Sequence, residues 1–203
     1  MYKLYGADTA NGHKAAIVLE ELGLSYEVVS IDLMSGEHQS AGFKEVNAVS
    51  KIPVLELDAN RVYGSLAIAL DLCEAHGKLL PAGPRGRFYE ALAVVATDLA
   101  PALSGQFMFS HIIEDKPASA IGYFTQESHR YLQALESYLH ADPFLAGEQY
   151  TLADALGYPN VAVSARRLLP DAEFSDRYPA LSAWQQRLED RPAVVSGMNA
   201  FKA

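Results

Sequence analysis

The alternation of apolar and polar positions in the first 80 residues predicts strands that alternate with helices. Residues 1–6 form a short segment that closes on a glycine, and residues 26–31 are rich in β-branched side chains, so both are predicted strands. Residues 11–14 have the composition of a turn, and apolar residues then recur at helical spacing over 15–22. Gly23 is the predicted end of this helix.

The segment that follows, residues 32–47, is polar and predicts a long loop with a short helix. Beyond it, two strand-like segments, 54–57 and 61–63, flank residues 58–60 (Asp-Ala-Asn). Short apolar segments separated by turn residues of this kind predict a β-hairpin.

Ser65 is placed to cap a helix whose apolar stripe is Leu66, Ala69, Leu70 and Cys73. The order of this region is therefore βαβαββα. A helix between the first two strands implies that they are parallel, and the last two strands then add in antiparallel fashion. Burial in the stripe explains Cys73 better than a role as a nucleophile.

The clearest break in the chain is residues 80–87, where two prolines and two glycines fall within seven residues. We take this segment as a linker between an α/β domain (1–79) and an all-helical domain (88–203). In the helical domain, residues 151–154 (Thr-Leu-Ala-Asp) resemble a capping box, and Pro159 is expected to kink the helix that begins there. The other predicted helices span 88–103, 119–140 and 179–189.

Composition and charge exclude several classes of function. The 203 residues carry a formal charge of −9, which opposes nucleic-acid binding and requires a local cluster of donors for any anionic ligand. A single cysteine excludes a disulfide framework, and six histidines without an i, i+4 pair give a metal site little support. No apolar run approaches the roughly 20 residues that cross a bilayer, and the N-terminus lacks a signal-peptide core. A cytoplasmic protein without a membrane partner is expected.

Several segments together resemble one family. Residues 4–6 (Leu-Tyr-Gly), 9–14 (Thr-Ala-Asn-Gly-His-Lys) and 19–22 (Leu-Glu-Glu-Leu) are similar to the opening of bacterial glutathione transferases, especially the nu class and its disulfide-bond reductases. Residues 51–54 (Lys-Ile-Pro-Val) resemble the segment that carries their cis-proline, and residues 151–154 resemble their helical-domain cap. The resemblance covers nearly the whole chain. It implies a thioredoxin-like first domain that binds glutathione, a helical domain that contributes the second-substrate pocket, and a homodimer. The implied function is an enzyme that activates the glutathione thiol for attack on an electrophile or for disulfide reduction.

The resemblance also implies how glutathione is held. The backbone of Ile52, before a cis-Pro53, pairs with the cysteinyl part of glutathione like an added rung of a sheet. Ser65, at the start of a helix, receives the γ-glutamyl carboxylate on its N–H and hydroxyl. Lys51, Gln39 and Arg130 match polar positions around the glycyl carboxylate or a second glutathione; their alternative role is solvated surface charge.

Thr9 and Asn11 are the residues that the resemblance places at the glutathione thiol, as donors that stabilise its thiolate. A free thiol has a pKa near 8.5, and lowering it by about one to two units requires roughly 1.4–2.7 kcal/mol of preference for the anion. A few hydrogen-bond donors and a helix N-terminus supply that, so no general base is needed. The alternative roles of both residues are turn formation and helix capping. Tyr5 is the rival for the thiol, because other classes use a tyrosine there.

Two residues depart from the family pattern. Gly64 stands where the family has an acid that helps to hold the glutathione amine, and Ala10 stands where the nu-class loop has proline. Gly64 therefore favours an alternative function, a binding or structural protein with little catalysis. Isomerisation or ether cleavage stays open as a third function, because the electrophile or disulfide substrate is set mainly by the helical domain. The expected lining of its pocket is Gln106, Phe107, Phe109, His111 and Tyr158.

Overall fold

The computed structural model describes residues 1–58, 60–168 and 171–202, which form two compact units. The first unit comprises Met1–Leu80 with Glu189–Ala203, and the second comprises Pro81–Leu188. The break after Leu80 lies where the sequence predicts a linker. The end of the chain differs from the expected division, because residues 189–203 belong to the first unit and not to the helical one.

The first unit contains a four-stranded sheet in the order β2-β1-β3-β4. Strand β1 is parallel to β2 and antiparallel to β3, and β3 pairs antiparallel with β4, as predicted. The predicted hairpin turn includes Ala59, which lies outside the described residues. The elements of this unit are β1 (Tyr2–Gly6), α1 (Ala10–Leu22), β2 (Tyr26–Ser30), a 3-10 turn (Glu37–Gln39), α2 (Ala41–Val46), β3 (Val54–Leu57), β4 (Asn60–Tyr63), α3 (Ser65–His76) and α10 (Pro192–Asn199).

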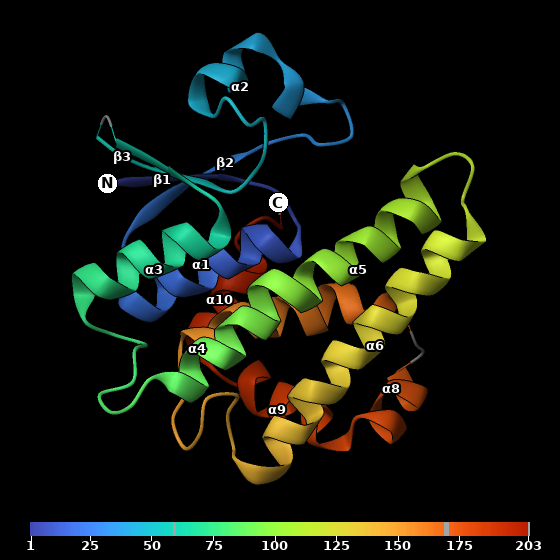
Figure 1. The fold of residues 1–203 in the computed structure, drawn as a ribbon. Helices are drawn as coiled ribbons and strands as arrows, with labels where there is room; N and C mark the ends of the chain where they lie inside the picture. Colours follow the sequence, from blue (N-terminus) through green and yellow to red (C-terminus); the bar gives the residue numbers. More distant parts are fainter. Residues whose placement is uncertain (59, 169–170, 203) are drawn as a thin grey trace. The chain divides into compact units, whose positions relative to one another are not determined.

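Helices cover both faces of this sheet (Figure 1). Side chains alternate between the faces of a strand, and on β1 Leu4 is fully buried on the side where α1 and α3 pack. On the other face, Phe43 of α2 packs with Ile31 and Val54 in a separate small core. The sheet is therefore the middle layer of the first unit.

Helix α10 packs along α1 within the first unit. Gly197 explains how closely the two helices approach, since a Cβ at this position would lie 2.6 Å from the backbone of Ile17. Val194 on the same face of α10 is 1% exposed. The packing of α10 on α1 is the reason why the end of the chain belongs to the first unit.

Helix α1 begins earlier than its apolar repeat predicts. The residues expected to form a turn, 11–14, are helical, because Thr9 caps the helix and its side chain accepts a hydrogen bond from the Gly12 N–H. At the other end, Gly23 has a left-handed conformation with φ of 71°, which confirms the predicted stop. The loop near the predicted thiol site is therefore shorter than expected, and Asn11 belongs to the first turn of a helix.

The second unit is helical throughout its regular structure, as predicted. One continuous helical segment runs from Gly86 to Ile112, longer than the predicted 88–103, and packs against α6. A π-helical stretch precedes Pro101 and another follows Pro159, because proline lacks the N–H of the α-helical ladder. The elements are α4 (Gly86–Ala93), α5 (Ala100–Phe107), α6 (Ala118–Ala141), α7 (Leu152–Pro159), α8 (Asp171–Arg177), α9 (Pro179–Glu189), π-helical stretches at Val94–Leu99, Met108–Ile112 and Asn160–Ser164, and a 3-10 turn at Ala165–Arg167.

The segment Gly86–Ile112 is, by length and composition alone, long and apolar enough to cross a membrane, with a mean hydropathy of 1.3 in its most apolar window. This differs from the expectation that no segment approaches such a length. A core helix of a folded helical bundle meets the same criterion, so a single helix of this kind is weak evidence for a membrane span.

Asp154 is the polar centre of the second unit, fully buried beside Trp184. Its carboxylate accepts hydrogen bonds from the N–H and Oγ1 of Thr151 at 2.9 and 3.1 Å, from the Leu145 N–H at 2.9 Å and from Trp184 Nε1 at 2.9 Å. Thr151 Oγ1 in turn accepts from the Ala153 N–H at 3.3 Å. The predicted capping box is confirmed, and it also joins a loop and α9 to the start of α7.

Candidate functional site

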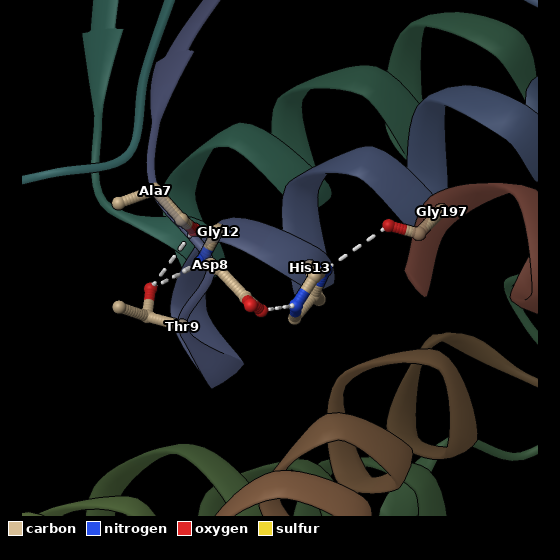
Figure 2. A network of polar contacts seen from close by, with 6 residues as sticks. All are labelled: Ala7, Asp8, Thr9, Gly12, His13 and Gly197. Atoms are coloured by element: carbon tan, nitrogen blue, oxygen red, sulfur yellow. Dashed lines mark hydrogen bonds and ion pairs between the residues drawn. The ribbon is translucent and has the colours of Figure 1, made fainter. Parts of the chain in front are cut away.

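Thr9 is the N-cap of α1 and lies at the end of the loop after β1 (Figure 2). Its Oγ1 accepts a hydrogen bond from the Gly12 N–H at 3.1 Å and donates to the Ala7 carbonyl at 3.4 Å, a long and therefore weak bond. A hydroxyl carries one donor and two acceptor sites. Thr9 can thus cap the helix and still turn its proton toward a ligand, so the capping role and the predicted thiol contact are compatible.

Asn11 is exposed in the first turn of α1, and its side chain is hydrogen-bonded to Lys14. Lys14 Nζ donates to Asn11 Oδ1 at 2.9 Å. Because Nζ is a donor, the amide oxygen faces the lysine and the two N–H donors of Nδ2 lie on the opposite branch. Lys14 is 2% exposed, and burial lowers its pKa to about 7.

His13 ties the loop between β1 and α1, residues 7–9, to the C-terminal segment of the chain, as Figure 2 shows. Its Nε2 lies 2.7 Å from Asp8 Oδ1, and its Nδ1 lies 3.1 Å from the Gly197 carbonyl oxygen. Both partner atoms are acceptors, so the ring satisfies both only when it carries a proton on each nitrogen. His13 is 1% exposed and fixes Asp8, the residue before Thr9, from the buried side.

Phe201 closes over the same loop and packs edge-on against His13, with ring centroids 5.8 Å apart. A Cβ at Gly6 would lie 2.5 Å from the Phe201 ring, and one at Gly12 would lie 3.1 Å from that ring and 2.3 Å from the Ala7 carbonyl oxygen. The two glycines are therefore required by close packing. The position of the loop between β1 and α1 therefore depends on residues almost 200 positions later in the sequence.

The Ile52–Pro53 peptide bond is cis, which confirms the prediction. Pro53 is buried, and its carbonyl accepts a hydrogen bond from the Gly64 N–H at 3.0 Å. The backbone N–H and C=O of Ile52 have no protein partner within the described part of the chain, and the ladder of β3 begins at Val54. Ile52 therefore offers a free donor and acceptor next to the end of a strand.

The start of α3 differs by one residue from the prediction. Gly64, with φ of 94°, is the N-cap, and Ser65 is the first helical residue and not the cap. The first backbone bond of the helix runs from the Ile68 N–H to the Gly64 carbonyl at 2.9 Å. The amides of Ser65, Leu66 and Ala67 have no acceptor among the residues that the structure describes, as is usual for the first turn of a helix.

The apolar stripe of α3 is also shifted from the predicted one. The buried residues are Ile68, Ala69, Leu72 and Cys73, while Leu66 and Leu70 are half-buried. The helix therefore turns residues 68 and 72 toward the sheet. Cys73 is buried as predicted, and desolvation raises the pKa of its thiol to about 12, which opposes a nucleophilic role.

The three predicted carboxylate-binding side chains lie in different places. Lys51 and Gln39 are exposed on the first unit, and the Asn47 side-chain amide fixes the Lys51 carbonyl at 2.8 Å. Arg130 lies on α6 in the second unit, where it pairs with Glu127 at 3.0 Å and remains 70% exposed. The ligand roles of all three stay predictions.

Tyr5, the rival for the thiol, belongs to the small core beneath α2. Its ring packs with the cluster that contains Phe43, and its hydroxyl lies 3.5 Å from Glu56 on β3. These contacts favour a structural role for Tyr5. The expected substrate pocket is corrected at one residue: Tyr158 is 5% exposed and packs against Trp184 with ring centroids 6.2 Å apart, so it is a core residue.

Comparison with known proteins gives two family matches. Residues 10–75 match the glutathione S-transferase N-terminal domain, and residues 98–192 match the glutathione S-transferase C-terminal domain. The disulfide-bond oxidoreductase YghU of Escherichia coli is 35% identical over 96% of this chain and 73% of its own length. The chain belongs to the glutathione S-transferase family. The disulfide-bond oxidoreductase YfcG of the same organism is 31% identical over 96% of this chain and 93% of its own length.

Solved structures of other glutathione transferases have the same fold. URE2P6 of Phanerochaete chrysosporium, in complex with oxidized glutathione, is 32% identical with a TM-score of 0.87, covering 97% of this chain and 94% of its own. A glutathione transferase YghU from Streptococcus pneumoniae, complexed with glutathione, is 33% identical with a TM-score of 0.85, covering 97% of this chain and 82% of its own. The described residues of this family member contain no group of three or more His, Cys, Asp and Glu side chains that could hold a metal ion.

Two residues next to the predicted site, His13 and Lys14, were not singled out from the sequence of this family member. Both residues belong to the segment 9–14 that resembles the family, but the composition of residues 11–14 is typical of a turn. A lysine that follows a helix cap by five residues and precedes an unbroken apolar run was the available signal, since that spacing turns it inward. The partner of His13 on α10 carries no local signal at all.

Proposed function

We propose that this transferase binds glutathione on its first unit and lowers the pKa of the bound thiol, so that the thiolate attacks a disulfide. The observation that carries the proposal is the N-terminus of α1, where the Thr9 hydroxyl donates only a long, weak bond to Ala7 and the Asn11 amide oxygen, not its N–H groups, is bonded to Lys14. A thiolate at a helix N-terminus gains from these donors and from the helix dipole.

The energies required are modest. Lowering the thiol pKa by about one to two units requires roughly 1.4–2.7 kcal/mol. A hydrogen bond to a charged group contributes about 1.5–3 kcal/mol. Thr9 and Asn11 together therefore suffice, and no residue has to remove the proton permanently, because solvent takes it at neutral pH.

Recognition of the rest of glutathione rests on backbone groups. The free N–H and C=O of Ile52, next to Pro53, suit pairing with the cysteinyl residue. The amides at the start of α3, from Ser65 onward, suit the γ-glutamyl carboxylate. Lys51, Gln39 and Arg130 are proposed for the glycyl carboxylate or a second glutathione. We also propose a cytoplasmic homodimer, in keeping with the resemblance.

In the proposed reaction the glutathione thiolate attacks one sulfur of a substrate disulfide. One S–S bond forms, the original S–S bond breaks, and the departing thiolate takes a proton from water. A second glutathione then attacks the mixed disulfide and releases oxidized glutathione, so that two glutathione molecules are oxidised for each disulfide reduced. The names of the two E. coli relatives, both disulfide-bond oxidoreductases, support a disulfide as the acceptor.

Gly64 favours a second candidate, a binding protein with little catalysis. It offers no carboxylate for the glutathione amine, and a charge-assisted contact of this kind is worth roughly 1–2 kcal/mol, or about five- to thirtyfold in affinity. Calorimetric titration with glutathione and glutathione disulfide, paired with turnover of a small disulfide, separates the two candidates. The proposed enzyme binds glutathione, weakly and on the order of millimolar, and reduces the disulfide. Binding without turnover would leave the second candidate.

A further inference from the structure

Lys14 is a buried amine that packing alone does not explain. It is 2% exposed on α1, and the residues that follow it, Ala15 to Leu19, are fully buried and apolar. No carboxylate of the described chain pairs with it, and desolvation is the cause that lowers its pKa to about 7. Burying an amine opposite a neutral partner opposes folding. An apolar side chain of the same length would fill this space at lower free energy.

The contact that Lys14 makes is with the thiol site. Its Nζ donates to Asn11 Oδ1 at 2.9 Å, one helical turn below. The amide of an asparagine has two nearly equivalent orientations unless a neighbour selects one. An Nζ donor selects the orientation in which the Asn11 oxygen is buried and its N–H donors point away from the lysine.

The same contact strengthens those donors. A hydrogen bond donated to the oxygen of an amide polarises that amide, so its N–H groups bind an anion more tightly in a dry environment.

We propose that Lys14 is the positioning residue of the thiol site, holding the Asn11 amide in its donor orientation. This inference rests on the proposed role of Asn11 at the glutathione thiol. Lys14 does not touch the sulfur; it acts through the amide that does.

The test compares Lys14→Met with Lys44→Met, the same change at an exposed position of α2 in the same unit. The ultraviolet absorbance of the thiolate, titrated with pH at saturating glutathione, gives the thiol pKa on each protein, and thermal melting gives stability. We expect Lys14→Met to raise the bound-thiol pKa by about one unit, to lower kcat about tenfold below that pKa with a change in KM of less than threefold, and to raise the melting temperature at pH 7. Lys44→Met should change none of these. Lower stability with an unchanged thiol pKa would overturn the inference, because it would make Lys14 a packing residue only.

A second pair of variants separates this inference from the proposed function. Asn11→Ala should raise the thiol pKa as well, and Lys14→Met should add little in that background, since it acts through Asn11. If Asn11→Ala leaves the thiol pKa and turnover unchanged, the proposed thiol site itself is wrong. If Asn11→Ala raises the pKa and Lys14→Met does not, only the role of Lys14 fails. Should Lys14→Met not fold, Lys14→Gln serves the same test, and a native thiol pKa in that variant overturns the inference.

Discussion

Two buried ionisable groups, one in each unit, have very different numbers of hydrogen-bond partners. Asp154 in the second unit accepts four hydrogen bonds, all between 2.9 and 3.1 Å, from a helix cap, a loop and an indole. Lys14 in the first unit donates to one neutral amide oxygen. Asp154 has the partners that a buried carboxylate needs to hold three segments together. Lys14 lacks the partners that would make its burial favourable.

The difference in hydrogen-bond partners indicates that Asp154 stabilises the fold, whereas Lys14 acts at the proposed site. Removing a buried group with many donors leaves those donors unsatisfied, which destabilises the protein strongly. Removing a buried amine with one neutral partner relieves desolvation and leaves little unsatisfied. Groups that oppose folding yet remain buried are concentrated at functional sites. The predictions below test this contrast, from the largest expected effect to the smallest.

Asp154→Ala should lower the free energy of unfolding by about 3–5 kcal/mol, because two buried backbone N–H groups and the Trp184 indole lose their acceptor. Denaturant unfolding at pH 7 measures it. Asp115→Ala, at an exposed position of the same unit, is the control and should stay within about 0.5 kcal/mol. A loss below about 1 kcal/mol for Asp154→Ala would mean that this carboxylate is not the centre of the unit.

Thr9→Ala and Asn11→Ala should each reduce kcat by the equivalent of about 1–3 kcal/mol, with a smaller change in glutathione affinity, because their contribution grows with charge on sulfur. Thr9→Ala should also lose about 1 kcal/mol of stability, since its hydroxyl caps α1. Steady-state kinetics with Tyr5→Phe as the control checks this. Native kcat in both variants, with Tyr5→Phe inactive, would transfer the role to the tyrosine.

Because burial lowers the pKa of Lys14, we expect the stability of the protein to rise with pH. The pKa of Lys14 is about 7 in the folded protein and near 10.4 in the unfolded chain, so between these values the unfolded state holds one more proton. Stability should therefore rise with pH through this window, by up to about 1.4 kcal/mol per pH unit, and the full penalty of burial should be present below pH 7. Unfolding measured from pH 6.5 to 8.5 should show this rise in the native protein relative to Lys14→Met. Parallel curves for the two proteins would contradict it.

Gly64→Ala should lower stability by about 1 kcal/mol, because φ of 94° is unfavourable for any residue with a Cβ. Gly42→Ala on α2, where a Cβ meets nothing within 4 Å and the backbone is helical, is the control and should be neutral or stabilising. For the same reason Gly64→Glu should not recover the full five- to thirtyfold gain in glutathione affinity that its charge alone would provide. A Gly64→Glu protein with native stability and that full gain would show that the backbone tolerates the side chain.

The features predicted correctly from the sequence are those that depend on short segments of the chain. The strand directions, the stop at Gly23 and the capping box at Thr151 were predicted from local sequence patterns, and the cis bond before Pro53 was implied by the family resemblance. Helix ends were predicted less well than helix centres. The composition of residues 11–14 is typical of a turn, but Thr9 caps α1, so these residues form the first turn of the helix.

What could not be predicted depends on contacts between distant segments. The place of α10 against α1 requires the close approach at Gly197, and the position of the loop between β1 and α1 depends on the contacts of His13 with Gly197 and Phe201. Ser65 was expected to be a cap because serine favours that position, but a positive φ one residue earlier gives the cap to Gly64. At this position the backbone conformation of Gly64, and not the preference of serine for N-cap positions, determines where α3 begins.

The most direct test of the account is the pKa of the glutathione thiol bound to the native protein, measured from the pH dependence of thiolate absorbance at saturating glutathione. With the Thr9 hydroxyl, the Asn11 amide and the buried Lys14 behind it, the bound thiol should ionise with a pKa of about 6.5–7.5, one to two units below that of the free thiol. A bound thiol with a pKa near 8.5 would contradict the account, because the first turn of α1 would then bind glutathione without activating it.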